Sequence, residues 1–146
     1  YDRFIRAQDP EISVYGKACP LFVPLVEEGW LKDPVTEEVA RRYLDELMQK
    51  GIDSLILGCT HYPLLRSLVR KIVGEEVTLV NPAYETAKEL ESLLRREGIE
   101  NHGGKADPAE GYQFFVSDAA DKFKNFANSI LPYDIETTRK INIEEY

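Results

Sequence analysis

The sequence predicts an α/β fold in which helices flank a parallel sheet. Short apolar runs alternate along the chain with amphipathic stretches of helical length, and this alternation is typical of parallel sheets. In one run, residues 54–58, the side chains that would point to either face of a strand are apolar, and the run ends at a glycine. This pattern is expected for a strand covered on both faces. We therefore expect a helix-flanked, parallel-sheet sandwich domain of the flavodoxin-like kind.

The composition excludes several classes of protein. The chain has 146 residues and a formal net charge of −8, and so acidic a chain repels the phosphate backbone of nucleic acids. No apolar run approaches the roughly 18 residues of a membrane span, and no secretory signal opens the sequence. Two cysteines are too few for a disulfide framework. We expect a cytoplasmic protein with neither a nucleic-acid nor a membrane partner.

The start of the sequence bears on whether this chain is part of a longer protein. The chain begins with Tyr1 rather than methionine, and residues 1–6 already have the character of ordered sequence. We interpret the chain as a piece of a longer protein, whose site would then be incomplete here.

The first third of the chain predicts one strand and two helices. Residues 11–16 predict a strand. Residues 19–28 are apolar and could begin a helix at Pro20, but Pro24 restricts it to a short or kinked one. Asp33 and Pro34 are a favourable N-cap and first helical residue. The helix that they begin ends at Gly51, and its apolar face is Val35, Val39, Ala40, Tyr43, Leu44, Leu47 and Met48.

The middle of the chain repeats strand and helix. The strand at residues 54–58 precedes a helix that carries Leu64, Leu65, Leu68, Val69 and Ile72 and ends at Gly74. Residues 77–80 predict the next strand. Asn81 then caps a helix that starts at Pro82, presents Ala83, Ala87, Leu90 and Leu94 on one side, and ends at Gly98.

The last third begins with a polar, glycine-containing loop at residues 100–111, which is a candidate seam between domains. A strand is predicted at residues 112–116. Ser117 or Asp118 is expected to cap a helix whose apolar residues run from Ala120 to Leu131. The tail around Ile141 and Ile143 predicts an edge strand.

Reactive side chains follow the strand at residues 54–58. Ligands of parallel sheets bind at the carboxyl ends of the strands, and there the chain has Cys59, Thr60 and His61 just before a helix. A helix N-terminus favours negative charge, including a thiolate. Two interpretations stay open: a thiol acid/base or nucleophile acting on an anionic substrate, and a buried core cysteine followed by a histidine that caps a helix.

Other candidate sites have less support. Zinc would need Cys19, Cys59, His61 and His102 together, yet His102 lies in a polar loop, and we predict no metal. A disulfide between Cys19 and Cys59 is conceivable but unusual in a cytoplasmic protein. We assign Cys19 to core packing. No hydrolase or nucleotide-binding glycine motif is present.

A family resemblance adds to this interpretation. Residues 55–65, LILGCTHYPLL, resemble the second cysteine motif of glutamate racemase in the aspartate/glutamate racemase superfamily. The flanking segments ACPLFVPLVE (residues 18–27) and VNPA (residues 80–83) resemble further segments of that family. The related aspartate racemases tend to have glutamate at the position of His61, so the resemblance favours glutamate as the substrate.

The resemblance implies an enzyme that interconverts L- and D-glutamate without a cofactor, by two cysteines that face each other across the α-carbon. Cys59 resembles the second of these, which acts on the L-glutamate face. His61 resembles a residue that assists the thiol or binds substrate, and Thr60 resembles a contact to the substrate carboxylate. Glu27 resembles a carboxylate on the histidine side, and Cys19 matches a position with no catalytic role.

The resemblance also implies what the chain lacks. The family's first cysteine motif, resembling Cys-Asn-Thr-Ala, and its N-terminal Asp-Ser motif do not occur here. The chain therefore resembles a C-terminal portion: residues 1–84 would be most of the second α/β domain, and residues 85–146 would return to the first. We expect the parent to be a homodimer that supplies D-glutamate for peptidoglycan. The isolated piece would be inactive, or a binding module only.

Overall fold

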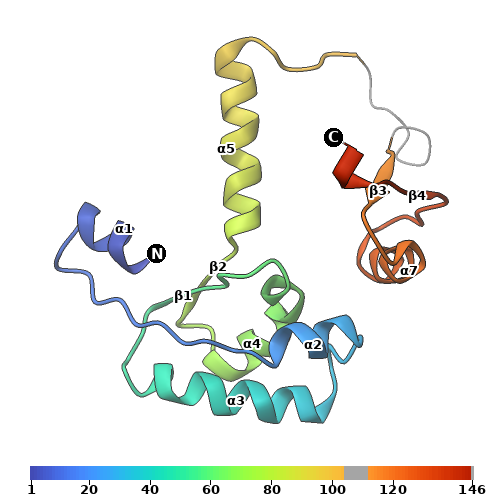
Figure 1. The fold of residues 1–146 in the computed structure, drawn as a ribbon. Helices are drawn as coiled ribbons and strands as arrows, with labels where there is room; N and C mark the ends of the chain where they lie inside the picture. Colours follow the sequence, from blue (N-terminus) through green and yellow to red (C-terminus); the bar gives the residue numbers. More distant parts are fainter. Residues whose placement is uncertain (104–111, 146) are drawn as a thin grey trace. The chain divides into compact units, whose positions relative to one another are not determined.

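The computed structural model describes residues 1–103 and 112–145. It divides the chain into two compact units, Tyr1–Leu90 and Glu91–Tyr146. The predicted division into residues 1–84 and 85–146 concerns domains of a larger protein and stays a prediction. The elements of the first unit are α1 (Asp2–Gln8), α2 (Phe22–Glu27), α3 (Pro34–Met48), β1 (Ser54–Ile56), the 3-10 helix η1 (Tyr62–Leu65), α4 (Arg66–Val73), β2 (Thr78–Val80) and most of α5 (Pro82–Glu97) (Figure 1).

The second unit begins within α5 and is also mixed helix and strand. Its elements are β3 (Phe114–Val116), α7 (Ala120–Ile130), β4 (Thr138–Lys140) and the 3-10 helix η2 (Ile143–Glu145). β3 pairs with β4 in parallel, with Phe115 opposite Arg139.

The first unit is built on a parallel strand pair. β1 pairs with β2 so that Leu55 lies opposite Leu79, and the amide of Leu57 extends the ladder by donating to the carbonyl of Val80 at 3.0 Å. Both described sheets are therefore parallel, and the α/β class predicted from the alternation of strands and helices is confirmed.

Helix α3 follows its local sequence signals. The Asp33 carboxylate accepts a hydrogen bond from the amide of Val35 at 2.8 Å, and Pro34 occupies the first turn, where its missing N–H costs nothing. The buried stripe is Thr36, Ala40, Leu44 and Leu47, which recur at helical spacing. Val35 was predicted in the core but lies off this stripe and is exposed; Thr36 is buried instead, with its hydroxyl donating to the carbonyl of Trp30 at 2.7 Å.

Helix α2 is the short helix that Pro24 predicted, although it begins at Phe22 rather than Pro20. Pro24 is its third residue, within the first turn, where an amide would have no partner inside the helix. Phe22 and Val26 are buried, and α2 packs against both α3 and η1. The core that these elements share in the first unit is Cys19, Phe22, Val26, Thr36, Ala40, Leu44, Leu47, Leu57, Leu65, Val69, Val73 and Val77.

Residues 11–16 do not form the predicted strand. A turn and a bend occupy residues 10–12 and the chain then runs irregularly to residue 19. The Val14 carbonyl accepts a hydrogen bond from the Arg6 guanidinium at 3.2 Å, and none of the described strands pairs with this segment. A strand needs a ladder partner, which the local alternation of side chains does not provide.

The predicted cap and tail of the second unit are corrected as well. The N-cap of α7 is Ala119, in the left-handed region at φ 45°, rather than Ser117 or Asp118. The Asp118 carboxylate instead pairs with the Lys140 ammonium at 2.8 Å, which lowers the pKa of Asp118. The strand of the tail is Thr138–Lys140, and it ends before Ile141 and Ile143.

Helix α5 matches its predicted limits. The Asn81 side chain accepts from the amide of Ala83 at 3.1 Å, and Gly98 follows the last helical residue with φ 66°. No residue of α5 is buried.

Within the described ranges no helix has the length and apolar character needed to cross a bilayer. The predicted seam at residues 100–111 lies mostly outside the described residues.

Substitution of Leu65 tests the hydrophobic core assigned to the first unit. Its side chain is 1% exposed, so Leu65→Ala should lower the free energy of unfolding by about 2–5 kcal/mol, since the cavity adds to the lost transfer energy. Urea denaturation measures the change. Leu21→Ala is the matched control, because Leu21 is 49% exposed. Equal losses in the two variants would contradict the assigned core.

Candidate active site

Cys59 stands at the carboxyl end of β1, as predicted. After Leu57 the chain turns sharply, with the amides of Gly58 and Cys59 donating to the carbonyls two residues back, at 3.0 and 2.9 Å. Cys59 is half-buried and the neighbouring Gly58 and Thr60 are exposed. Cys59 is therefore not fully buried in the core, whereas His61 is the N-cap residue of the 3-10 helix η1, as the alternative interpretation expected.

The His61 imidazole lies beside this thiol. Its Nδ1 atom is 3.9 Å from Cys59 Sγ and 3.2 Å from Thr60 Oγ1. One ring nitrogen therefore lies beside both the Cys59 thiol and the Thr60 hydroxyl. The predicted trio Cys59, Thr60 and His61 is brought together because the three are consecutive residues of one loop.

Glu27 reaches the other side of the same ring. Its Oε1 atom is 3.6 Å from His61 Nε2, and Glu27 is the last residue of α2. A carboxylate beside one ring nitrogen favours a hydrogen on that nitrogen. In a singly protonated ring, a hydrogen on Nε2 would leave Nδ1 as the acceptor that faces Cys59.

The helix after the loop starts later than predicted. Residues 62–65 form a 3-10 helix that contains Pro63, and the α-helix begins only at Arg66. The α-helical N-terminus is thus seven residues beyond Cys59. A side-chain contact of the thiol is with the His61 ring, at 3.9 Å.

Cys19 lies outside this cluster. It is 6% exposed, and burial raises the pKa of its thiol from the ordinary 9.0 to about 11. The thiol contacts the carbonyl of Lys17 at 3.7 Å. Both cysteines are free, so the conceivable disulfide is absent, and Cys19 packs in the core as predicted.

His102 is exposed, as its loop composition predicted. Among the described residues no group of three or more histidine, cysteine or acidic side chains is placed to hold a metal ion.

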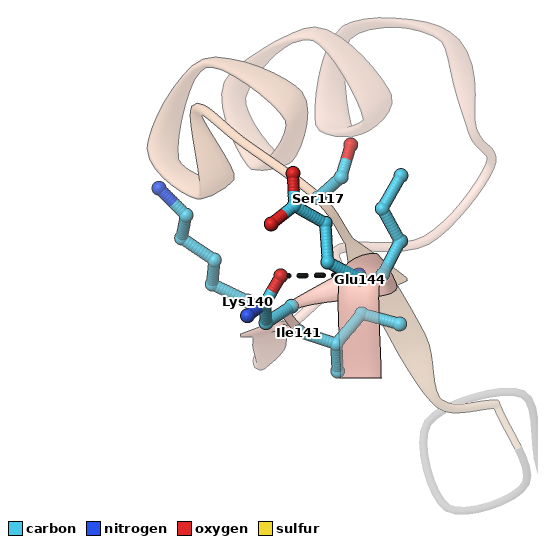
Figure 2. Close-up of a pocket in the computed structure, with 6 residues that line it drawn as sticks. Ser117, Lys140, Ile141 and Glu144 are labelled. Atoms are coloured by element: carbon cyan, nitrogen blue, oxygen red, sulfur yellow. Dashed lines mark hydrogen bonds between the residues drawn. The ribbon is translucent and has the colours of Figure 1, made fainter. Parts of the chain in front are cut away.

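A surface depression of about 560 Å³ lies in the second unit, at the carboxyl ends of β3 and β4. Figure 2 shows Ser117, from the end of β3, facing the segment from Lys140 to Glu144 that follows β4. The amide of Glu144 donates to the Asn142 side chain at 3.1 Å, and Lys140 is paired with Asp118. None of the residues predicted for the site lines this depression.

Comparison with known proteins identifies the relatives of the chain. The glutamate racemase of Thermoanaerobacter sp. (strain X514) is 41% identical over 148 residues, which cover 100% of this chain and 54% of the relative. That of Geobacter metallireducens is 38% identical, covering 99% of this chain and 52% of the relative. This chain is a homologue of part of the glutamate racemases.

Solved structures of glutamate racemases have the same fold. The enzyme from Francisella tularensis subsp. tularensis SCHU S4, in complex with D-glutamate, matches with a TM-score of 0.88 and 33% identity, over 100% of this chain and 53% of that one. The enzyme from Thermus thermophilus, in complex with β-chloro-D-alanine, matches with a TM-score of 0.76 and 39% identity, over 89% and 48%. No protein-family model matches the chain. The chain spans about half the length of the glutamate racemases that it matches.

The two cysteines should react differently with iodoacetamide. At about pH 8 the half-buried Cys59 should be alkylated in the native protein, whereas Cys19, buried and with a raised pKa, should react only after denaturation. Peptide mass spectrometry measures the two rates. Alkylation of Cys19 at the rate of Cys59 without denaturant would contradict its burial.

Burial of Cys19 also gives a pH dependence. Its folded-state pKa is raised, so the contribution of this thiol to stability is fully present below the ordinary 9.0 and is lost as the pH rises towards about 11. The free energy of unfolding should therefore fall over this range, and Cys19→Ala should reduce the slope. Denaturation curves at a series of pH values measure it, and an unchanged slope in the variant would contradict the assignment.

Proposed function

We propose that the full-length protein that carries this chain is a cofactor-independent glutamate racemase, and that this chain supplies one of its two catalytic thiols. The observation that best supports this proposal is the position of Cys59. This residue is half-buried at the carboxyl end of β1, and its sulfur atom lies 3.9 Å from His61 Nδ1. Homology to glutamate racemases over the whole chain supports glutamate as the substrate. One relative of known structure was crystallised with D-glutamate.

The proposed reaction transfers two protons. The thiolate of Cys59 removes the α-hydrogen of L-glutamate: the C–H bond breaks, an S–H bond forms, and the electron pair stays on Cα, where the neighbouring carboxylate delocalises it. A second thiol on the opposite face then donates its proton to Cα and gives D-glutamate. In the reverse direction the two sulfur atoms exchange roles.

His61 and Thr60 are proposed to prepare the thiol. With its hydrogen on Nε2, facing Glu27, the His61 ring offers its Nδ1 lone pair to the proton of Cys59. The Thr60 hydroxyl, 3.2 Å from Nδ1, competes for the same lone pair. A substrate carboxylate that accepts the Thr60 hydroxyl would remove this competition, so substrate binding and thiol activation would be coupled.

The second thiol is proposed to come from outside these residues. Cys19 is the other cysteine of the chain and is buried in the core with a raised pKa. The relatives are about twice as long as the chain, which leaves room for the missing group. We propose that the chain is a C-terminal portion, with residues 1–84 from one domain and residues 85–146 returning to the other.

The chemistry requires both halves. An amino-acid α-hydrogen is very weakly acidic, so its removal needs strong electrostatic stabilisation in a site closed to water. With Cys59 alone, the proton would return to the face from which it came. We propose that the complete protein is a cytoplasmic homodimer that provides D-glutamate for peptidoglycan.

The same thiol–imidazole distance would also suit a cysteine nucleophile. That alternative requires a covalent adduct between Cys59 and an acyl substrate, whereas a racemase exchanges only protons. The intact mass of the protein after incubation with substrate separates the two reactions.

Replacement of the proposed base tests the function. In the full-length protein Cys59→Ser should lower the rate of deuterium uptake at Cα of glutamate by roughly 10²–10⁴-fold, because a hydroxyl is a far poorer base than a thiolate. Nuclear magnetic resonance in D₂O measures the uptake.

The matched control is Cys19→Ser, the same chemical change at a buried site. The serine hydroxyl can keep the contact to the Lys17 carbonyl, so activity should stay within about twofold once folding is verified. Retained racemisation in Cys59→Ser, or equal losses in both variants, would count against the assigned base.

A further inference from the structure

Tyr62 directly follows His61 but faces a different group of residues. Its ring lies 5.3 Å from that of Phe22, at an interplanar angle of 87°. Its hydroxyl donates to the carbonyl of Cys19 at 3.3 Å. The same carbonyl accepts the amide of Phe22 at 3.1 Å, so both contacts of Tyr62 are made at the start of α2.

The other end of α2 carries Glu27, which is 3.6 Å from His61. A helix of six residues is about 9 Å long, so its two ends cannot move independently. Two adjacent residues at the start of η1 therefore contact the two ends of one short helix: Tyr62 contacts the beginning of α2, and His61 contacts its end. Between them Val26 is fully buried, which turns the helix so that Glu27 lies at the surface.

The Tyr62 hydroxyl keeps the proton that it donates to the Cys19 carbonyl. Burial raises its pKa above the ordinary 10.0, so it keeps its proton at neutral pH. Edge-to-face aromatic pairs have a preferred geometry, and the Phe22 ring makes a second such pair with Tyr43, at 5.4 Å and 76°. Tyr62 thus contacts a ring that is itself fixed against α3.

We propose that Tyr62 is a positioning residue of the site: its ring on Phe22 and its hydroxyl on the Cys19 carbonyl hold α2 against the Cys59 loop and so keep the Glu27 carboxylate beside His61. The inference rests on the proposed function only for its catalytic consequence. The positioning itself concerns the geometry of this chain and can be measured through the reactivity of Cys59.

The first experiment measures the rate at which iodoacetamide alkylates Cys59 in the full-length protein, resolved by peptide mass spectrometry. Tyr62→Phe keeps the ring contact and removes only the hydroxyl, and it should slow the reaction about threefold or more, the effect of one hydrogen bond. Tyr62→Leu removes both contacts and should slow it further.

Tyr43→Phe is the matched control. It makes the same chemical change in the same aromatic cluster. The Tyr43 hydroxyl accepts from the amide of Leu21, the N-cap of α2, at 3.4 Å, so it joins α2 to α3 and not to the Cys59 loop. The control should leave the rate within about twofold. Equal effects of Tyr43→Phe and Tyr62→Phe would overturn the proposal, and this comparison stands even if Tyr62→Leu does not fold.

A double-mutant cycle with Glu27→Gln separates positioning from a general structural role. If Tyr62 acts through Glu27, Tyr62→Phe should have no further effect on the alkylation rate once Glu27→Gln is present. Independent, multiplicative effects would overturn the proposal. An unchanged rate in Glu27→Gln alone would do so too, because Tyr62 would then have nothing to position.

Racemisation gives the second readout. Tyr62→Phe should lower kcat by a similar factor and leave KM unchanged, because the pair that it positions prepares the thiol. A rise in KM with constant kcat would contradict the assigned role. If the unaltered protein does not racemise glutamate, the proposed function fails, whereas the alkylation cycle still decides whether Tyr62 positions Glu27.

Discussion

The parallel pairing of β1 with β2 is the constraint on which the candidate site depends. The two strands run in the same direction, so the chain must leave β1 at its carboxyl end and cross over before it enters β2. That exit is where Gly58 and Cys59 turn. The crossover is η1 followed by α4, and Leu65, Val69 and Val73 bury it in the core. The thiol is therefore held by a strand on one side and by an anchored helix on the other.

The second constraint is the packing of α2 across the loop. Neither α2 nor the loop would define a site alone: α2 is too short to be stable without tertiary contacts, and the loop has no regular structure between residues 57 and 61. Phe22 and Val26 bury one side of α2, and the opposite side presents Glu27. The arrangement of thiol, imidazole and carboxylate is thus a product of hydrophobic packing, and the polar contacts refine it.

Local signals predicted much of this structure, and non-local contacts account for what they missed. Helix α3 follows from Asp33, Pro34 and a glycine stop, all within its own sequence, and Cys59 and His61 were associated because they are two residues apart. Glu27 and His61 are 34 positions apart, and it was the family resemblance that assigned Glu27 to the histidine side of the site, because periodicity could not distinguish a site carboxylate from a solvated helix end. The strand at residues 11–16 and the cap at Asp118 failed for the same reason: a ladder partner was missing in one case, and Lys140, distant in sequence, took the carboxylate in the other. Phe22, Tyr43 and Tyr62 follow one another at intervals of about twenty residues, and no periodicity connects them.

The different environments of the two sulfur atoms have a consequence for oxidative damage. Oxidation of cysteine to sulfenic acid and beyond depends on access of the oxidant to the sulfur. Cys19 is enclosed by the core and Cys59 is half-exposed, so peroxide should reach the sulfur of Cys59 long before that of Cys19. Oxidation would then change Cys59 while the core around Cys19 kept its fold, and a thiol reductant could restore Cys59 as long as oxidation had not passed the sulfenic stage.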